Sequence, residues 1–191
     1  MSSRNFFIIF SIFIVAGLSL YYLIDAGFYP IAIVNGKFIS DRSFNQSFNS
    51  AQYYYSQAIK TYTAQANNNL QAVALELRRA LLDKMVQDIL VSQELEIKVG
   101  SQLPNLVATK LGNLKIDSQN FNQAVAAVYG LDFDQFKELV LVPQAKQEIL
   151  QANFQSQNNS FVDWLKNTRH IANVIILAPD LKWDGQNVAV R

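Results

Sequence analysis

The stretch that decides the fold covers residues 70–100 and reads LQAVALELRRALLDKMVQDILVSQELEIKVG. With successive residues about 100° apart on a helix, its apolar side chains cover a wide arc and its polar side chains a narrow one. The apolar set is Leu70, Val73, Leu77, Leu81, Leu82, Met85, Val86 and Ile89. The polar set is Glu76, Asp83, Gln87, Glu94 and Lys98. An outer helix needs only one apolar stripe, so we expect a central helix with several neighbours and with the polar set as its solvent edge.

The composition excludes several classes of function. Apart from Arg4, the chain carries 15 basic and 15 acidic side chains, because the whole has 16 and 15. A neutral chain without a basic cluster has no electrostatic attraction for nucleic acid, so we expect no nucleic-acid partner. The absence of cysteine removes disulfides, thiolate catalysis and cysteine metal sites.

An apolar segment without charged side chains covers residues 6–24. At about 1.5 Å per residue it nearly spans a hydrocarbon layer about 30 Å thick. The segment is longer than the apolar region of a signal peptide and lacks a small-x-small cleavage site, which favours an uncleaved signal anchor over a cleaved signal. Arg4 precedes the segment and Asp25 follows it, so the positive-inside tendency places the N-terminus in the cytoplasm and the rest outside.

Residues 31–40 predict a β-hairpin followed by a helix. Residues 31–34 have strand character, Asn35 and Gly36 form a two-residue turn, and residues 38–39 form the return strand. Ser40 or Asp41 then begins an amphipathic helix. Its apolar face contains Phe44, Phe48, Ala51, Tyr55, Ala58, Ile59 and Tyr62.

The rest of the chain predicts shorter helices and a final pair of strands. Helices are expected to begin at Pro104, at Asp117 or Ser118, at Asp132 and at Ser160, with Gly112 and Gly130 as stops. The second of these carries Phe121, Val125 and Val128 on its inner side. Pro143 should kink or divide the third, because proline has no backbone N–H and clashes with the preceding turn. Strands are expected at residues 174–177 and 188–190.

The sequence contains little that could support catalysis. His170 is the only histidine, so a histidine pair for zinc is impossible, and its place near a helix end favours a capping role. Asp132, Asp134 and Glu138 are typical of a helix start, with a catalytic carboxylate pair as the alternative. No Gly-rich phosphate loop or G-x-S-x-G motif occurs. We therefore expect no enzyme, no catalytic residue, no cofactor and no metal.

Four segments, in this order, carry a resemblance to a known family. They are IAIVNGKFIS at residues 31–40, LRRALLDKMVQDILVSQE at 77–94, YGLDFDQF at 129–136 and FVDWLKNTRHIANVIIL at 161–177. This order resembles the N-terminal chaperone domain of the SurA, PrsA and PpiD family. In that family a parvulin-type prolyl isomerase domain usually precedes the closing helix. Here only residues 155–159 occupy that interval, so the resemblance comes without an isomerase domain.

The resemblance implies a mainly α fold and a binding function. We expect an N-terminal transmembrane segment (residues 1–24), a linker (25–30), a SurA-like helical domain (31–177) with a small two- or three-stranded sheet joining its ends, and a tail (178–191). The strand at 31–34 should pair with that at 174–177. The family implies an ATP-independent holdase for unfolded or newly exported polypeptides, on the outer side of a bacterial cell membrane. The alternative is an envelope adaptor that holds one fixed partner.

Binding of unfolded segments requires exposed apolar and aromatic surface on a rigid scaffold. Tyr53 and Tyr54 lie outside the apolar stripe of the helix that begins at residue 40 or 41, and Tyr62 lies near its end. We take Tyr53, Tyr54 and Tyr62 as candidate client-binding residues, with filling of gaps between helices as the alternative role.

Overall fold

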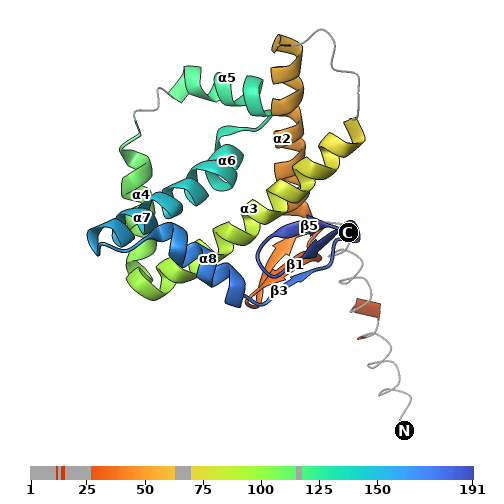
Figure 1. Cartoon of the computed structure of the whole chain (residues 1–191). Helices are drawn as coiled ribbons and strands as arrows, with labels where there is room; N and C mark the ends of the chain where they lie inside the picture. The colour runs from red at the N-terminus through yellow and green to blue at the C-terminus, as the bar shows by residue number, and fades with distance from the viewer. Residues whose placement is uncertain (1–11, 13, 16–26, 63–69, 115–117) are drawn as a thin grey trace, which may run out of the picture.

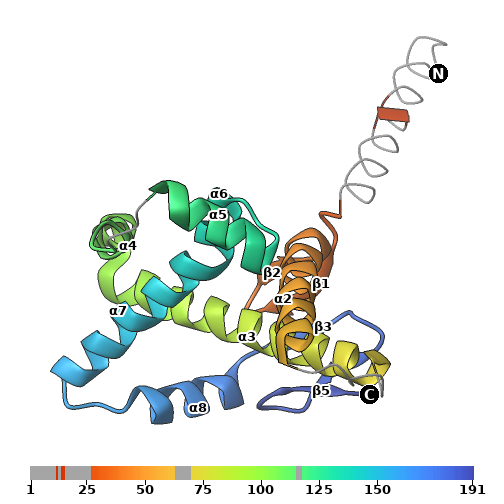
Figure 2. The ribbon, with the colours of Figure 1, turned by 90° about the horizontal axis from the view of Figure 1, so that it is seen from above.

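Residues 70–99 form one uninterrupted helix, α3 (Leu70–Val99), through the middle of the protein (Figures 1 and 2). The computed structural model describes residues 12, 14–15, 27–62, 70–114 and 118–191. Five side chains of α3 are almost completely buried: Leu82, Val86, Leu90, Val91 and Leu95. The helix packs against helices on several sides and against strands from both ends of the domain. The predicted central helix is confirmed.

A three-stranded antiparallel sheet closes the domain. It consists of β1 (Pro30–Val34), β2 (Lys37–Ser40) and β3 (Val174–Ile176), in the order β2-β1-β3. Asn35 and Gly36 have φ of 46° and 81°, as a tight two-residue hairpin turn requires. Val34 pairs with Val174 and Ala32 with Ile176, so the predicted joining of the domain's ends is confirmed.

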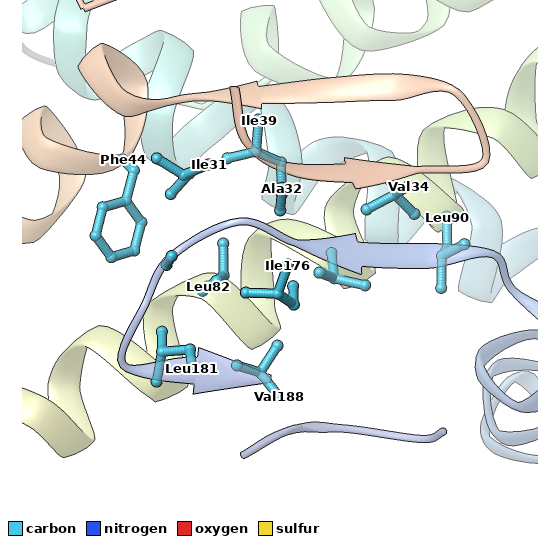
Figure 3. Packing of buried hydrophobic residues seen from close by; sticks show 12 residues of the cluster. Ile31, Ala32, Val34, Ile39, Phe44, Leu82, Leu90, Ile176, Leu181 and Val188 are labelled. Atoms are coloured by element: carbon cyan, nitrogen blue, oxygen red, sulfur yellow. The ribbon is translucent and has the colours of Figure 1, made fainter. Parts of the chain in front are cut away.

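The inner face of this sheet packs on the middle of α3, around Leu82, Val86 and Leu90 (Figure 3). Ala32, Val34 and Ile176 point from the strands toward Leu82 and Leu90 of the helix (Figure 3). Burying apolar side chains of this size is the main stabilising contribution to such a core, at roughly 1.5–3 kcal/mol for each large side chain.

The last residues of the chain contribute to the same core. β4 (Leu181–Trp183) and β5 (Val188–Val190) form a second, two-stranded sheet that packs on α3. Leu181 and Val188 are almost completely buried beside Leu82 (Figure 3). The segment 178–191, expected to be a turn and strand tail, contains these two strands and contributes Leu181 and Val188 to the core.

The expected solvent edge of α3 is wrong for two of its residues. Both carboxylate oxygens of Asp83 accept hydrogen bonds from Arg169, and Oδ1 also accepts one from the Val188 N–H. The side-chain oxygen of Gln87 accepts another from Arg169. The sequence period of α3 could not show this, because the cover comes from a helix and a strand about a hundred residues later.

α2 (Asp41–Tyr62) follows the hairpin, and the hydroxyl of Ser40 caps its start by accepting from the Ser43 N–H at 3.2 Å. Phe44 is buried under the guanidinium of Arg78, whose central carbon lies 5.1 Å from the ring centroid. The expected inner position of Tyr55 is wrong, since this side chain is exposed. Side chains 58–62 lie outside the described part.

Further helices follow α3. They are η1 (Gly100–Gln102), α4 (Leu103–Gly112), α5 (Ser118–Tyr129), α6 (Phe133–Phe136), η2 (Lys137–Leu141), α7 (Val142–Ser156) and α8 (Phe161–Ile171). Of these, α4, α7 and α8 pack on α3, whereas α5 packs on α2. The predicted caps at Asp132 and Ser160 are confirmed, because Asp132 accepts from the Gln135 N–H and Ser160 from the Asp163 N–H. Val125 is buried as predicted, whereas Val128 is exposed.

Pro143 changes the helix before it. η2 is a π-helical turn in which the Val142 N–H donates to the Lys137 carbonyl, five residues earlier. Proline has no N–H for the regular α-helical bond, and the wider turn provides the adjustment at that point. The prediction of a kink or division at Pro143 is confirmed in this form.

The predicted membrane segment, residues 6–24, lies outside the described residues except for Ile12, Ile14 and Val15. Among the helices that the structure describes, none combines the length and the apolar character needed to cross a bilayer.

Candidate functional site

A groove of about 470 Å³ lies between α2, α3 and η2, beside the edge strand β2. Its lining is mostly apolar, with hydroxyl groups on α2 and three charged side chains on α3 and η2. The lining residues are Phe38, Ile39, Ser40, Ser43, Ser47, Ser50, Ala51, Tyr54, Leu81, Lys84, Met85, Asp88, Ile89, Ser92, Tyr129, Leu131, Glu138, Leu139, Val140 and Pro143. The volume lies within the range of pockets that bind small molecules or short chain segments, about 300–1,000 Å³.

Small side chains form the α2 wall. Ser43, Ser47 and Ser50 follow one another at helical spacing, with Ala51 beside them. The Ser50 hydroxyl donates to the Tyr129 carbonyl at 2.9 Å, which fixes the end of α5 against α2. Sequence analysis missed these serines, although small residues repeating every three or four positions were the available signal.

Tyrosines form one end of the groove. The ring of Tyr54 stacks on that of Tyr129, with centroids 5.4 Å apart and planes 10° apart. Tyr129 in turn contacts Phe136, at 4.9 Å between centroids. Tyr54 is 48% exposed, so this aromatic end is accessible from solvent. Aromatic faces of this kind bind apolar and aromatic side chains.

The structure separates the three candidate tyrosines. Tyr54 lines the groove, whereas Tyr53 is not among the lining residues and lies on Gly130, where a β-carbon would come within 3.3 Å of its Cγ. Gly130 has φ of +65°, so it both ends α5 and leaves room for that ring. The Tyr62 side chain lies outside the described part. Client binding by Tyr53, Tyr54 and Tyr62 stays a prediction.

α3 contributes apolar side chains and one ion pair. Leu81, Met85 and Ile89 provide the apolar part of this wall. The Lys84 ammonium lies 2.6 Å from a carboxylate oxygen of Asp88. Burial raises the pKa of Asp88 above its ordinary value, and the charges of Lys84 and Lys146 oppose that rise. The ionised carboxylate is thus held in the wall at an energetic cost.

η2 forms the opposite wall with Glu138, Leu139 and Val140, and Pro143 at the start of α7 adjoins them. In a regular α-helix the Val142 N–H would donate to the Glu138 carbonyl, but here it donates to the Lys137 carbonyl. Pro143 has no N–H to donate. Neither residue therefore donates to the Glu138 carbonyl in the regular way. π-Helical turns are frequent at functional sites, which is consistent with the place of this one beside the groove.

Neither a metal centre nor a catalytic cluster is apparent in the described ranges 27–62, 70–114 and 118–191. No group of three or more His, Asp or Glu side chains there could hold a metal ion. His170 lies exposed in the last turn of α8, and Asp132 is engaged as the cap of α6. What the groove offers is apolar contact, aromatic stacking and hydrogen bonding.

These features define a class: a mainly helical domain built on one long central helix, closed by a small sheet, with an apolar groove. The model of the SurA-like N-terminal domain family matches residues 5–104, and the chain belongs to that family. No curated protein and no solved structure with which the chain was compared matches it. The match covers the hairpin, α2 and α3, which carry two walls of the groove.

Family membership confirms the resemblance seen in the sequence and connects the domain with chaperones. The domain of this family is a chaperone-type domain without catalytic function. α7 ends at Ser156 and α8 begins at Phe161, so a short turn connects these two helices.

Proposed function

We propose that this protein is a membrane-anchored, ATP-independent holdase that binds unfolded or newly exported polypeptides, without isomerase activity. The observation that carries the proposal is the groove between α2, α3 and η2. Its walls are mostly apolar and aromatic, and its polar groups are hydroxyls, the Lys84–Asp88 ion pair and the carboxylate of Glu138. Such a surface binds apolar segments of many sequences, because contact with them needs no precise set of charged partners.

The size of the groove limits what it binds at one time. About 470 Å³ accommodates a short segment of a client and no folded domain. The proposed holdase therefore recognises short apolar segments that a folded protein would bury. Binding them would lower the concentration of aggregation-prone chains in stoichiometric proportion to the chaperone.

Aggregation assays test the proposal. The full chain, in detergent or nanodiscs, should slow aggregation of several unrelated, chemically unfolded proteins at a near-equimolar ratio. Ser47→Trp places a large side chain in the groove and should remove most of this protection. Ser101→Trp is the matched control, because Ser101 is exposed and lies outside the groove lining. Thermal unfolding of both variants checks that the fold is kept.

Two results would overturn the proposal. One is a wild-type protein that protects none of the clients. The other is a folded Ser47→Trp variant that protects as well as Ser101→Trp. A single stable partner in a pull-down, together with either result, would favour the envelope adaptor.

The proposed location is a bacterial cell membrane, with residues 6–24 as a single-pass anchor, the N-terminus in the cytoplasm and the groove on the outer side. The support is the uncharged apolar segment between Arg4 and Asp25. Because the chain has no cysteine, Lys166→Cys in α8 provides a unique label site. A membrane-impermeant maleimide should label it in intact cells, after permeabilising an outer membrane where one is present. Labelling only after lysis of the inner membrane would contradict this orientation.

A further inference from the structure

The hydrogen bonds of β1 show which backbone groups of β2 are left at the sheet edge. Toward β3, the Ile31 carbonyl accepts from the Leu177 N–H at 2.8 Å, and the Asn35 N–H donates to the Asn173 carbonyl at 2.8 Å. Backbone groups of a strand alternate in direction, so Ile33 also faces β3. Ala32 and Val34 then face β2.

The pairing register between β1 and β2 shows which backbone groups of β2 face β1. Val34 pairs with Lys37, Ile33 with Phe38 and Ala32 with Ile39. Lys37 and Ile39 therefore direct their N–H and C=O toward β1. Phe38 lies between them, so its N–H and C=O point away from β1, to the free edge of the sheet. Within the described part of the chain, β1 is the sole strand paired with β2.

The groove lies along this edge. Phe38, Ile39 and Ser40 are consecutive residues of its lining, and the Phe38 side chain is 69% exposed. Beyond them the groove continues between the serines of α2 and the apolar side chains of α3 and η2. An edge strand with an unpaired donor and acceptor is a template for another extended chain.

We propose that the groove takes a client segment in extended conformation, as an added strand on the free edge of β2, with the Phe38 N–H and C=O as its backbone partners. This inference rests on the proposed holdase function and specifies its substrate class. Side chains of an extended segment alternate between two faces, so the preferred clients have apolar residues at every second position. A helical client is disfavoured, because its backbone groups are already bonded to one another.

Backbone-modified peptides test this inference on the wild-type full chain. The probe is a fluorescent octapeptide with Val or Leu at alternate positions, which gives it one apolar face. With this face on the groove, the direction of the added strand decides which backbone edge faces β2. Two versions carry N-methyl groups, one on the amides of one edge and one on those of the other. Methylation of the one edge that faces β2, whichever of the two it is, should weaken binding roughly tenfold, since it removes the hydrogen bond to the Phe38 carbonyl. Methylation of the opposite edge should leave the affinity nearly unchanged.

A variant pair tests the same contact from the protein side. Phe38→Pro removes the N–H that points to the edge, and proline is tolerated at such edge positions. Phe38→Ala removes the ring and keeps the N–H. The proline variant should bind the unmethylated peptide several-fold more weakly than the alanine variant. If the proline variant fails to fold, the two methylated peptides decide alone.

The outcomes separate the two proposals. Equal affinity of both methylated peptides, at or near that of the unmethylated one, would overturn the added strand while leaving the holdase intact. Failure of the unmethylated peptide to bind the wild type, or binding that Ser47→Trp does not affect, would overturn the groove as a client site and with it the holdase.

Discussion

The polar residues of α3 face two different environments. On one side Asp83 and Gln87 face α8 and the C-terminal strands, and Arg169 donates to both. On the other side Lys84 and Asp88 face the groove. The four residues are near neighbours in the sequence, so the difference between the two sides comes from what covers them. One side is closed by later segments of the chain, and the other is open to a ligand.

The closed side is a dense polar network. Arg169 is buried and donates to both carboxylate oxygens of Asp83, to the Gln186 carbonyl and to the side chains of Asn187 and Gln87. A buried charge is tolerated when it is paired and hydrogen-bonded, as both terminal nitrogens of Arg169 are here. The open side has a single ion pair with Lys84 half exposed. α3 is therefore fixed from one side and accessible from the other.

The largest expected effect follows from breaking the closed side. Arg169→Ala should lower the free energy of unfolding by about 3 kcal/mol, because Asp83 is left with its charge mostly covered and without its main partner. Urea denaturation followed by far-UV circular dichroism measures the loss. Lys37→Ala is the control, since it breaks an exposed ion pair of 3.9 Å and should cost at most about 0.5 kcal/mol. A loss no greater than that of the control would show that the network does not fix α3.

The next largest effect is expected for the apolar side chains of β5, which packs on α3. Val188 and Val190 lie in one strand, the first 1% and the second 39% exposed. Val188→Ala should cost about 2 kcal/mol through lost burial and the cavity left beside α3. Val190→Ala should stay within about 0.5 kcal/mol. Thermal unfolding of the two variants compares them directly, and equal melting temperatures would mean that the C-terminal sheet contributes nothing to the core.

The polar contacts on the closed side of α3 could not be predicted from the sequence, for a physical reason. The periodicity of residues 70–100 predicts the length of α3 and its apolar arc, because burial repeats with the helical turn. The same periodicity predicts Asp83 and Gln87 at the solvent edge, because it contains no information about polar partners from residues 169–188. The Asn35-Gly36 turn and the caps at Asp132 and Ser160 were predictable, because their bonds are local.

The groove was predictable only in part. Tyr54 was a candidate because it lies outside the apolar stripe of its helix, and the structure places it in the lining. Its stacking partner Tyr129 lies 75 positions later, and the relative placement of α5 and α2 that brings them together depends on tertiary packing. The π-helical turn at residues 137–141 follows from Pro143, although its place beside the groove does not.

A smaller effect is expected on the open side. Lys84→Ala should cost about 0.5 kcal/mol, because the ammonium is half exposed and Lys146 remains near Asp88. Urea denaturation beside Arg169→Ala provides the comparison. A loss as large as that of Arg169→Ala would contradict the view that the groove side contributes little to the fixing of α3.

The smallest effect is a difference in pH dependence between two carboxylates. Burial raises the pKa of Asp88, so the folded state binds its proton more readily than the unfolded state, and stability from this group falls as the pH rises above 3.8. Asp88→Asn should therefore be slightly more stable than the wild type at pH 7, with the difference vanishing near pH 3.

Asp184 provides the control of opposite sign. Its pKa is lowered because its carboxylate accepts from the Asn187 and Gln186 N–H groups, at 2.7 and 2.8 Å. The ionised Asp184 carboxylate stabilises the folded state above its ordinary pKa, and this stabilisation is lost as the pH falls. Asp184→Asn should therefore be less stable than the wild type at pH 7. Urea denaturation of both variants at pH 3 and pH 7 measures the two signs. If Asp88→Asn loses stability at pH 7 as Asp184→Asn does, the Asp88 carboxylate stabilises the fold. The polar side chains on the groove side of α3 would then contribute to stability, as those on the closed side do.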